Sequence, residues 1–208
     1  MAAAEEKLLN YEDDSEEVLE EVFGIKKQRV ISLICSHLPD LDITRICRVK
    51  NSFLKGLYDL KKEEYKSRYG NVTERCLFHA TSEWNVYSII KDNLDWRRVS
   101  RSKFGMGVSF SDDADYANHF SNSNNGSSRA IIIANVLISK EHCGSPAMTI
   151  PLLNYDTTTG TRNGIKKVYV KYNDNEFLPE YVVFYKSPEK TTSKYYTVHR
   201  GFRRHRLW

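Results

Sequence analysis

The pattern of apolar and polar positions predicts helices mainly in the first half of the chain and short strands in the second. Residues 43–49 alternate between the two kinds of side chain, as a half-buried strand does. Asn51 can cap a helix that runs to about Tyr69, because apolar side chains then recur at helical spacing. Gly70 is a residue type that commonly ends helices, so this helix has a defined start and end.

A strand followed by a helix is predicted next. Residues 75–79 read as a strand that ends in a histidine, His79. Thr81 or Ser82 is then suited to cap a helix. Three apolar residues of this helix are expected to face inward: Val86, Ile89 and Ile90. Residues 108–110 predict a further short strand.

Strands dominate the rest of the chain. Three aspartates, Asp112, Asp113 and Asp115, favour the start of one more helix, because carboxylates stabilise a helix N-terminus. Residues 129–137 form a continuous apolar run, which predicts a fully buried strand. Residues 156–164 are rich in Thr, Gly and Asn and predict a long surface loop. Residues 167–172 and 181–185 alternate, so both are predicted strands. Helices and strands grouped in this way predict an α+β fold with a largely antiparallel sheet.

The length of 208 residues suits one domain with a sizeable core. Residues 1–25 are interpreted as a lead-in that is partly disordered or helical, and residues 26–186 as the domain. Residues 187–208 form a basic C-terminal tail, whose last nine residues hold four arginines. Such a tail could contact nucleic acid or an acidic partner, although most are simply solvated.

Other sequence features limit the classes of protein. No apolar window is long enough to span a membrane, and the N-terminus lacks the apolar region of a signal peptide. We therefore expect a cytoplasmic or nuclear protein that makes no membrane contact. We also expect it to be a monomer. The four cysteines are widely spaced, which favours reduced thiols over a disulfide framework or a metal site.

Three segments together resemble a known family. These are residues 76–82 (CLFHATS), 103–111 (KFGMGVSFS) and 177–185 (FLPEYVVFY), in this order. They resemble the catalytic domain of the poly(ADP-ribose) polymerases (PARPs). Residues 93–97 are similar to the branch that holds mono-ADP-ribosyltransferases and the zinc-finger antiviral protein. The resemblance implies the ADP-ribosyltransferase fold, a split and mostly antiparallel sheet flanked by helices. It also implies NAD+ as a substrate and no metal.

The first motif implies that His79 is the catalytic residue that hydrogen-bonds a ribose hydroxyl. Ala80 and Thr81 stand where the family has glycine and a hydroxyl residue, beside the nicotinamide carboxamide. In the second motif, Ser109 replaces a tyrosine that flanks the nicotinamide, and Phe110 follows it. A serine has no ring to stack on a pyridinium.

The helix after the second motif implies two further contacts. By spacing, Ala117 falls on the family's small hydroxyl residue and Phe120 on its second stacking aromatic. Tyr116 is adjacent and could take part if the helix begins one residue differently; surface or core positions are the alternative for these residues.

The third motif decides between polymer and single-unit transfer. Polymer-forming members carry a glutamate there, and we align Val182 with it. A different register would put Glu180 at this position. With His79, Ser109 and Val182 as the signature, the resemblance implies a mono-ADP-ribosyltransferase that modifies protein side chains and releases nicotinamide. The alternatives are an inactive pseudoenzyme that acts as an interaction module and, more remotely, an NAD+ hydrolase. The acceptor protein is not indicated.

Overall fold

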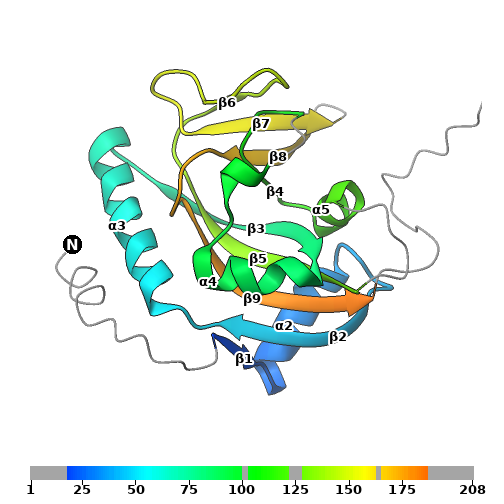
Figure 1. Ribbon diagram of the computed structural model, residues 1–208. Coiled ribbons are helices and arrows are strands. Elements are labelled where there is room, and N and C mark those ends of the chain that lie inside the picture. Colours follow the sequence, from blue (N-terminus) through cyan, green and yellow to red (C-terminus); the bar gives the residue numbers. More distant parts are fainter. Residues whose placement is uncertain (1–17, 100–102, 122–127, 163–164, 187–208) are drawn as a thin grey trace, which may run out of the picture.

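The computed structural model describes residues 18–99, 103–121, 128–162 and 165–186. Within these residues the chain forms one nine-stranded sheet with helices on both faces (Figure 1). The strands follow in spatial order: β1 (Leu19–Glu21), β2 (Asp42–Val49), β9 (Phe177–Lys186), β5 (Ser128–Ile138), β3 (Thr73–Ser82), β4 (Val108–Ser111), β8 (Ile165–Lys171), β7 (Thr157–Arg162) and β6 (Glu141–Cys143).

The sheet is almost entirely antiparallel and nearly divided in two. Of the strand pairs in the described residues, only β6 and β7 run parallel. At the centre, β3 and β4 share one register pair, Phe78 with Ser111, whereas β3 pairs with β5 along its whole length. The predicted α+β class and the split, mostly antiparallel sheet are therefore confirmed.

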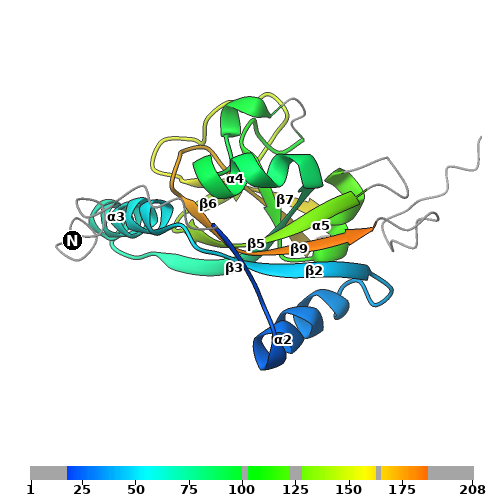
Figure 2. The ribbon, with the colours of Figure 1, turned by 60° about the horizontal axis from the view of Figure 1, so that its bottom comes forward.

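The helices are α2 (Gly24–Cys35), α3 (Ser52–Tyr69), α4 (Val86–Asp92) and α5 (Ala114–Ser121). Viewed along the sheet, α2 and α4 lie on opposite faces (Figure 2). On the face of α2 and α5, the core includes Val30, Ile34, Phe78, Ala80 and Ala114. On the face of α4, the core includes Leu77, Val86, Ile89, Ile132 and Val182.

The predicted helix after Asn51 is confirmed, and its caps explain its limits. The Asn51 carboxamide oxygen accepts a hydrogen bond from the Leu54 N–H at 2.9 Å. Its Nδ2 donates to the carbonyls of Ile90 and Lys91 at the end of α4, so one side chain joins the two helices. Gly70 ends α3 with φ of 81°, a left-handed conformation that favours glycine.

Residues 19–25, predicted to belong to a lead-in, are part of the domain. β1 pairs with β2 from Leu19 to Glu21, and Val22 is buried in the core. α2 already begins at Gly24. The sequence did not predict this strand because β1 is only three residues long and two of its residues are glutamates. The basic tail, residues 187–208, lies outside the described residues.

The predicted surface loop at residues 156–164 is wrong. Residues Thr157–Arg162 form β7, which pairs with β8, and Thr157 and Thr158 are fully buried. Threonine is favoured in strands because its β-branched side chain packs well on a sheet. The hydroxyl groups are satisfied: Thr157 Oγ1 donates to Asp156 at 2.6 Å, and Thr158 Oγ1 donates to the Phe104 carbonyl at 2.7 Å.

The predicted strand that ends at His79 is longer in the structure. β3 continues through Thr81 to Ser82, because its pairing with β5 persists to Arg129. A 3₁₀ turn at Glu83–Asn85 follows, and α4 begins only at Val86. The inward orientation predicted for the apolar residues of this helix is confirmed: Val86, Ile89 and Ile90 are buried.

Candidate active site

His79 lies where the two halves of the sheet separate. Its Nδ1 is 3.0 Å from the carbonyl oxygen of Ser109 on β4. A carbonyl oxygen only accepts hydrogen bonds, so Nδ1 carries the proton and donates. Nε2 of a neutral ring is then a hydrogen-bond acceptor. The contact with Ser109 therefore fixes both the orientation of the imidazole and the kind of group that its free nitrogen can bind.

The electrostatic surroundings favour the neutral form of His79. Burial lowers the pKa of the imidazole below its ordinary value of 6.5, because desolvation disfavours the charged ring. The hydrogen bond to the Ser109 carbonyl acts in the opposite direction, and the nearby Arg129 guanidinium lowers the pKa further. At neutral pH the ring is thus uncharged and ready to accept a hydrogen bond from a hydroxyl group.

The ring of Phe110 packs against the ring of His79. The two ring centroids are 5.9 Å apart and the rings are tilted by 59°. Phe110 is only 1% exposed and packs in the core with Leu77 and Ile132. Phe110, which the sequence predicted to contact NAD+, is therefore a buried residue that packs against the His79 ring.

Val182 lies on the same rung of the sheet as His79. The register pairs His79 with Ile132 on β5, and Ile132 with Val182 on β9. Directly opposed residues in a sheet point to the same face. Val182 is fully buried among Val86 and Ile90 of α4. The position across from His79 is thus occupied by an apolar side chain.

Glu180 lies on the other face of the sheet from His79. It sits in a bulge of β9, where the register moves from Tyr181 to Pro179, and it accepts a hydrogen bond from Asn135 Nδ2 at 3.2 Å. Asn135 pairs with Cys76, three residues before His79, so strand alternation puts the two on opposite faces. Burial raises the pKa of the Glu180 carboxyl. This geometry gives Val182, and not Glu180, the place opposite His79.

Ala80 and Thr81 continue β3 beyond His79. The Ala80 methyl group is 5% exposed and belongs to the core beneath α5. Thr81 is also buried, and its Oγ1 accepts a hydrogen bond from Asn85 Nδ2 at 3.0 Å. Both side chains are therefore packed against the protein itself, and the Thr81 hydroxyl ties the strand to the turn before α4.

The two glycines of the second motif are required by packing against β8. A Cβ atom at Gly107 would lie 2.2 Å from the Lys171 carbonyl oxygen. Gly105 has φ of +130°, and a Cβ there would lie 1.6 Å from the Tyr172 hydroxyl. Ser109 follows two residues after Gly107, and its side chain is exposed on β4. The glycines thus place β4, and with it the carbonyl that holds His79.

Two predicted site residues on α5 face different parts of the sheet: Ala117 faces β3, and Tyr116 faces β8. Ala117 is half-buried against the core that contains Phe78 and Ala80. Tyr116 is 6% exposed and packs with Val170 and other residues of β8 and its end. Tyr116 is therefore a core residue on the β8 side. The side chain of Phe120 lies outside the described part of the chain.

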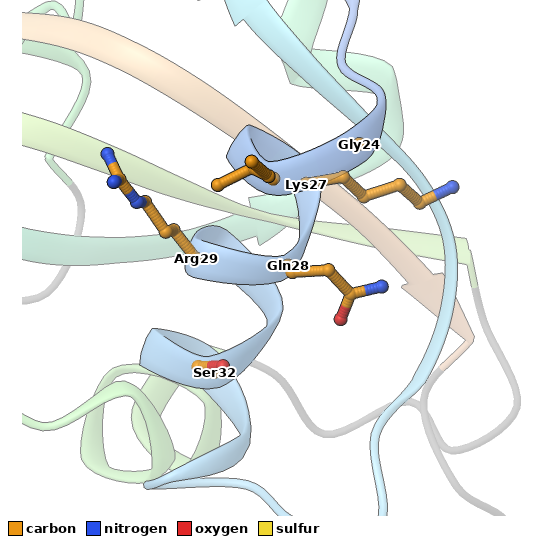
Figure 3. Close-up of a pocket in the computed structure, with 6 residues that line it drawn as sticks. Gly24, Lys27, Gln28, Arg29 and Ser32 are labelled. Atoms are coloured by element: carbon orange, nitrogen blue, oxygen red, sulfur yellow. The ribbon is translucent and has the colours of Figure 1, made fainter.

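A separate hollow of about 620 Å³ lies on the solvent side of α2 (Figure 3). Six residues line it: Gly24, Ile25, Lys27, Gln28, Arg29 and Ser32. α2 packs on the face of the sheet opposite His79, so the hollow is not part of this site.

No three His, Cys, Asp or Glu side chains gather as a metal would require, as far as the structure describes the chain. Within the same residues, no helix is long and apolar enough to cross a membrane.

Comparison with known proteins agrees with this geometry. Residues 34–164 match the poly(ADP-ribose) polymerase catalytic domain. The chain belongs to this family. It is 29% identical to human protein mono-ADP-ribosyltransferase PARP12 over 174 residues, 78% of this chain and 24% of that protein. It is 38% identical to mouse protein mono-ADP-ribosyltransferase PARP11 over 82 residues, 38% of this chain and 25% of that protein. The chain thus spans about a quarter of these relatives.

Some residues around this PARP-family site were not predicted from the sequence. Arg129 is 2% exposed and lies close enough to His79 to influence its pKa. The sequence feature that could have indicated Arg129 is a positively charged residue at the start of an otherwise apolar run. His37 and Asp113 come together, with His37 Nδ1 3.3 Å from Asp113 Oδ1. Their positions in the chain gave no sign of this contact.

Proposed function

We propose that this PARP-family domain transfers a single ADP-ribose unit from NAD+ to protein side chains and releases nicotinamide. The observation that carries the proposal is the state of His79. Its Nδ1 is engaged by the Ser109 carbonyl and its ring is neutral, which leaves Nε2 as an acceptor for a ribose hydroxyl. A hydroxyl donor fits this nitrogen, whereas another acceptor does not.

The chemistry needs orientation more than a strong catalytic group. The bond between the ribose C1′ and the pyridinium nitrogen breaks, and its electron pair leaves with nicotinamide, which becomes neutral. The ribose carbon becomes oxocarbenium-like and is attacked by a nucleophile of the target protein. His79 would hold the ribose during this step, and a fixed pose of this kind removes much of the entropic cost of reaction.

Val182 supports transfer of one unit only. A buried valine cannot bind a ribose hydroxyl, and the Glu180 carboxylate lies on the other face of the sheet, bonded to Asn135. Activation of a second ADP-ribose unit would need an acceptor group at this place. A carboxylate of the target protein could instead supply its own negative charge, so acidic side chains are the favoured acceptors. The mono-ADP-ribosyltransferase names of the relatives agree with this proposal.

A second candidate function is a PARP-like pseudoenzyme that serves as an interaction module. The observation in its favour is that Ser109 of the second motif offers no ring and Ala117 of α5 offers no hydroxyl group. Loss of one stacking wall weakens nicotinamide binding by about 0.5–1.5 kcal/mol beyond the lost burial. A loss of this size lowers the affinity for NAD+ but leaves the contact between His79 and the ribose in place. For this reason we prefer the enzymatic function.

Release of nicotinamide from NAD+ tests the proposal without knowledge of the acceptor. We expect release by the purified domain, and its loss in His79→Ala. His142→Ala is a matched control, because His142 lies on β6 and bonds to its own neighbourhood, the Cys143 carbonyl and the Leu152 N–H. Absence of release from a folded domain would favour the pseudoenzyme.

A further inference from the structure

We propose that His37 is a positioning residue: from the face of the sheet opposite the His79 side chain, it holds the N-terminus of α5 against β3 and so fixes the junction of β3 and β4 beside His79. The proposal rests on the function above, because it concerns the same site. β3 carries His79, and β4, which ends at Ser111 shortly before α5 begins, carries the Ser109 carbonyl that orients the His79 ring.

The first contact of His37 is with the cap of α5. The Asp113 carboxylate accepts hydrogen bonds from the backbone N–H groups of Asp115 at 3.0 Å and Tyr116 at 3.4 Å, and the Asp113 carbonyl accepts from Ala117. This is the geometry of a helix N-cap. His37 Nδ1 approaches the same carboxylate oxygen at 3.3 Å. The carboxylate is nearly buried and its oxygens can only accept, so the role open to His37 Nδ1 in this pair is that of donor.

The second contact of His37 is with β3. Its ring meets the Phe78 ring edge-on, with centroids 5.3 Å apart and planes at 65°. Phe78 immediately precedes His79, and its register partner across the split is Ser111. Ser111 Oγ in turn accepts a hydrogen bond from the Asp113 N–H at 3.1 Å. His37, Phe78, Ser111 and Asp113 thus form a closed ring of contacts where β4 leaves β3 and α5 begins.

His37 itself is attached to a rigid element. It lies two residues after the end of α2, and its N–H donates to the Ile34 carbonyl at 3.0 Å. Ile34 is fully buried in the core that contains Phe78, Ala80 and Ala114. α2 therefore acts as the anchor, and His37 transmits its position to the start of α5. A shift of about 1 Å in an element that positions a reacting group can change a rate by about a hundredfold, so a single side chain can have a measurable effect.

Two variants separate the contacts of His37. His37→Phe keeps a ring against Phe78 but removes the donor to Asp113. His37→Asn keeps a donor near the place of Nδ1 but removes the ring. Ile34→Val is the control for general loss of stability, since it removes one buried methyl group and leaves His37 intact.

Hydrogen exchange of the first-turn amides of α5 is the first readout. We expect exchange at Asp115 and Tyr116 about tenfold faster in His37→Phe, and close to wild type in His37→Asn. Unchanged exchange in His37→Phe would overturn the proposal. An equal increase in Ile34→Val would also overturn it, because the effect would then be global.

Nicotinamide release is the second readout. We expect kcat to fall about tenfold in His37→Phe with a smaller change in KM, and to recover in His37→Asn. A wild-type kcat in His37→Phe would contradict the positioning role. If the wild-type domain releases no nicotinamide, the proposed function fails, and the exchange experiment still decides whether His37 holds α5.

Discussion

His79 and Val182 lie on one rung of the sheet, with Ile132 of the intervening strand between them. This relationship puts an apolar, fully buried side chain at the position where, under the proposed function, a carboxylate would support chain elongation. Under the proposed function, the domain has a histidine that would hold a ribose and lacks the carboxylate that would activate a second unit.

Restoring a carboxylate at this place is expected to destabilise the domain. Val182 packs with Val86 and Ile90, so Val182→Glu would bury an unpaired charge and cost about 3–5 kcal/mol in the free energy of unfolding. Denaturant unfolding measures the loss. Val182→Gln separates size from charge, since only the loss in Val182→Glu should shrink as pH falls and the carboxyl becomes protonated. A stable Val182→Glu protein that forms polymers would contradict this account.

The pH dependence of His79 has a definite sign. Its folded-state pKa is lowered, so between that value and 6.5 the unfolded chain binds more protons than the folded one. The stability contribution of neutral His79 is therefore complete above pH 6.5 and is lost as pH falls through this window. His79→Gln should flatten this part of the stability profile, measured by denaturant unfolding. A profile identical to wild type would show that His79 does not titrate in this way.

Gly107→Ala tests the close approach of the second motif to β8. The added methyl group would meet the Lys171 carbonyl oxygen, and the resulting displacement is expected to cost about 1–3 kcal/mol. It should also reduce nicotinamide release, because β4 carries the carbonyl that orients His79. Gly70→Ala is the matched control: it is strained by its positive φ, but no atom lies within 4 Å, and it is far from the site. Equal activity in the two variants would count against this role for the glycine.

A buried charge cluster fastens α3 to the second half of the sheet. Lys171 Nζ lies 2.8 Å from Asp156 Oδ2 and 3.0 Å from the Tyr65 hydroxyl, and Tyr65 bonds to Glu176. Lys171→Met would leave buried carboxylates without their cation, and we expect a loss of about 3–5 kcal/mol in thermal or denaturant unfolding.

Lys66→Met is the control for this cluster, because Lys66 pairs with Glu63 on the exposed side of α3. Such surface pairs contribute about 0–1 kcal/mol. Similar stability losses in the two variants would mean that the cluster is not the source of the effect.

The parts of the fold that were predictable are those whose signal is local. The alternation in residues 43–49 and the apolar run at 129–137 identified β2 and β5, because burial of one or both faces leaves a periodic pattern. β7 was missed because its threonines have the composition of a loop. Their burial depends on hydroxyl partners such as the Phe104 carbonyl, which comes from a distant segment.

The same distinction holds at the candidate site. His79 and Ser109 were found through motifs, and their contact follows from adjacent strands. The ring orientation of Tyr116 was not predictable, because one residue of helical phase decides whether it faces the site or β8. His37 was missed entirely, since its meeting with Asp113 depends on how α2 and α5 pack on the sheet.

The most direct test of the central claim is the intact mass of an acidic acceptor protein after incubation with NAD+ and the domain. We predict adducts of single ADP-ribose units on the acceptor, absent with His79→Ala and retained with His142→Ala. A ladder of polymer masses would contradict the role given to Val182. Free ADP-ribose without any adduct, or an unmodified acceptor with intact NAD+, would contradict transfer itself.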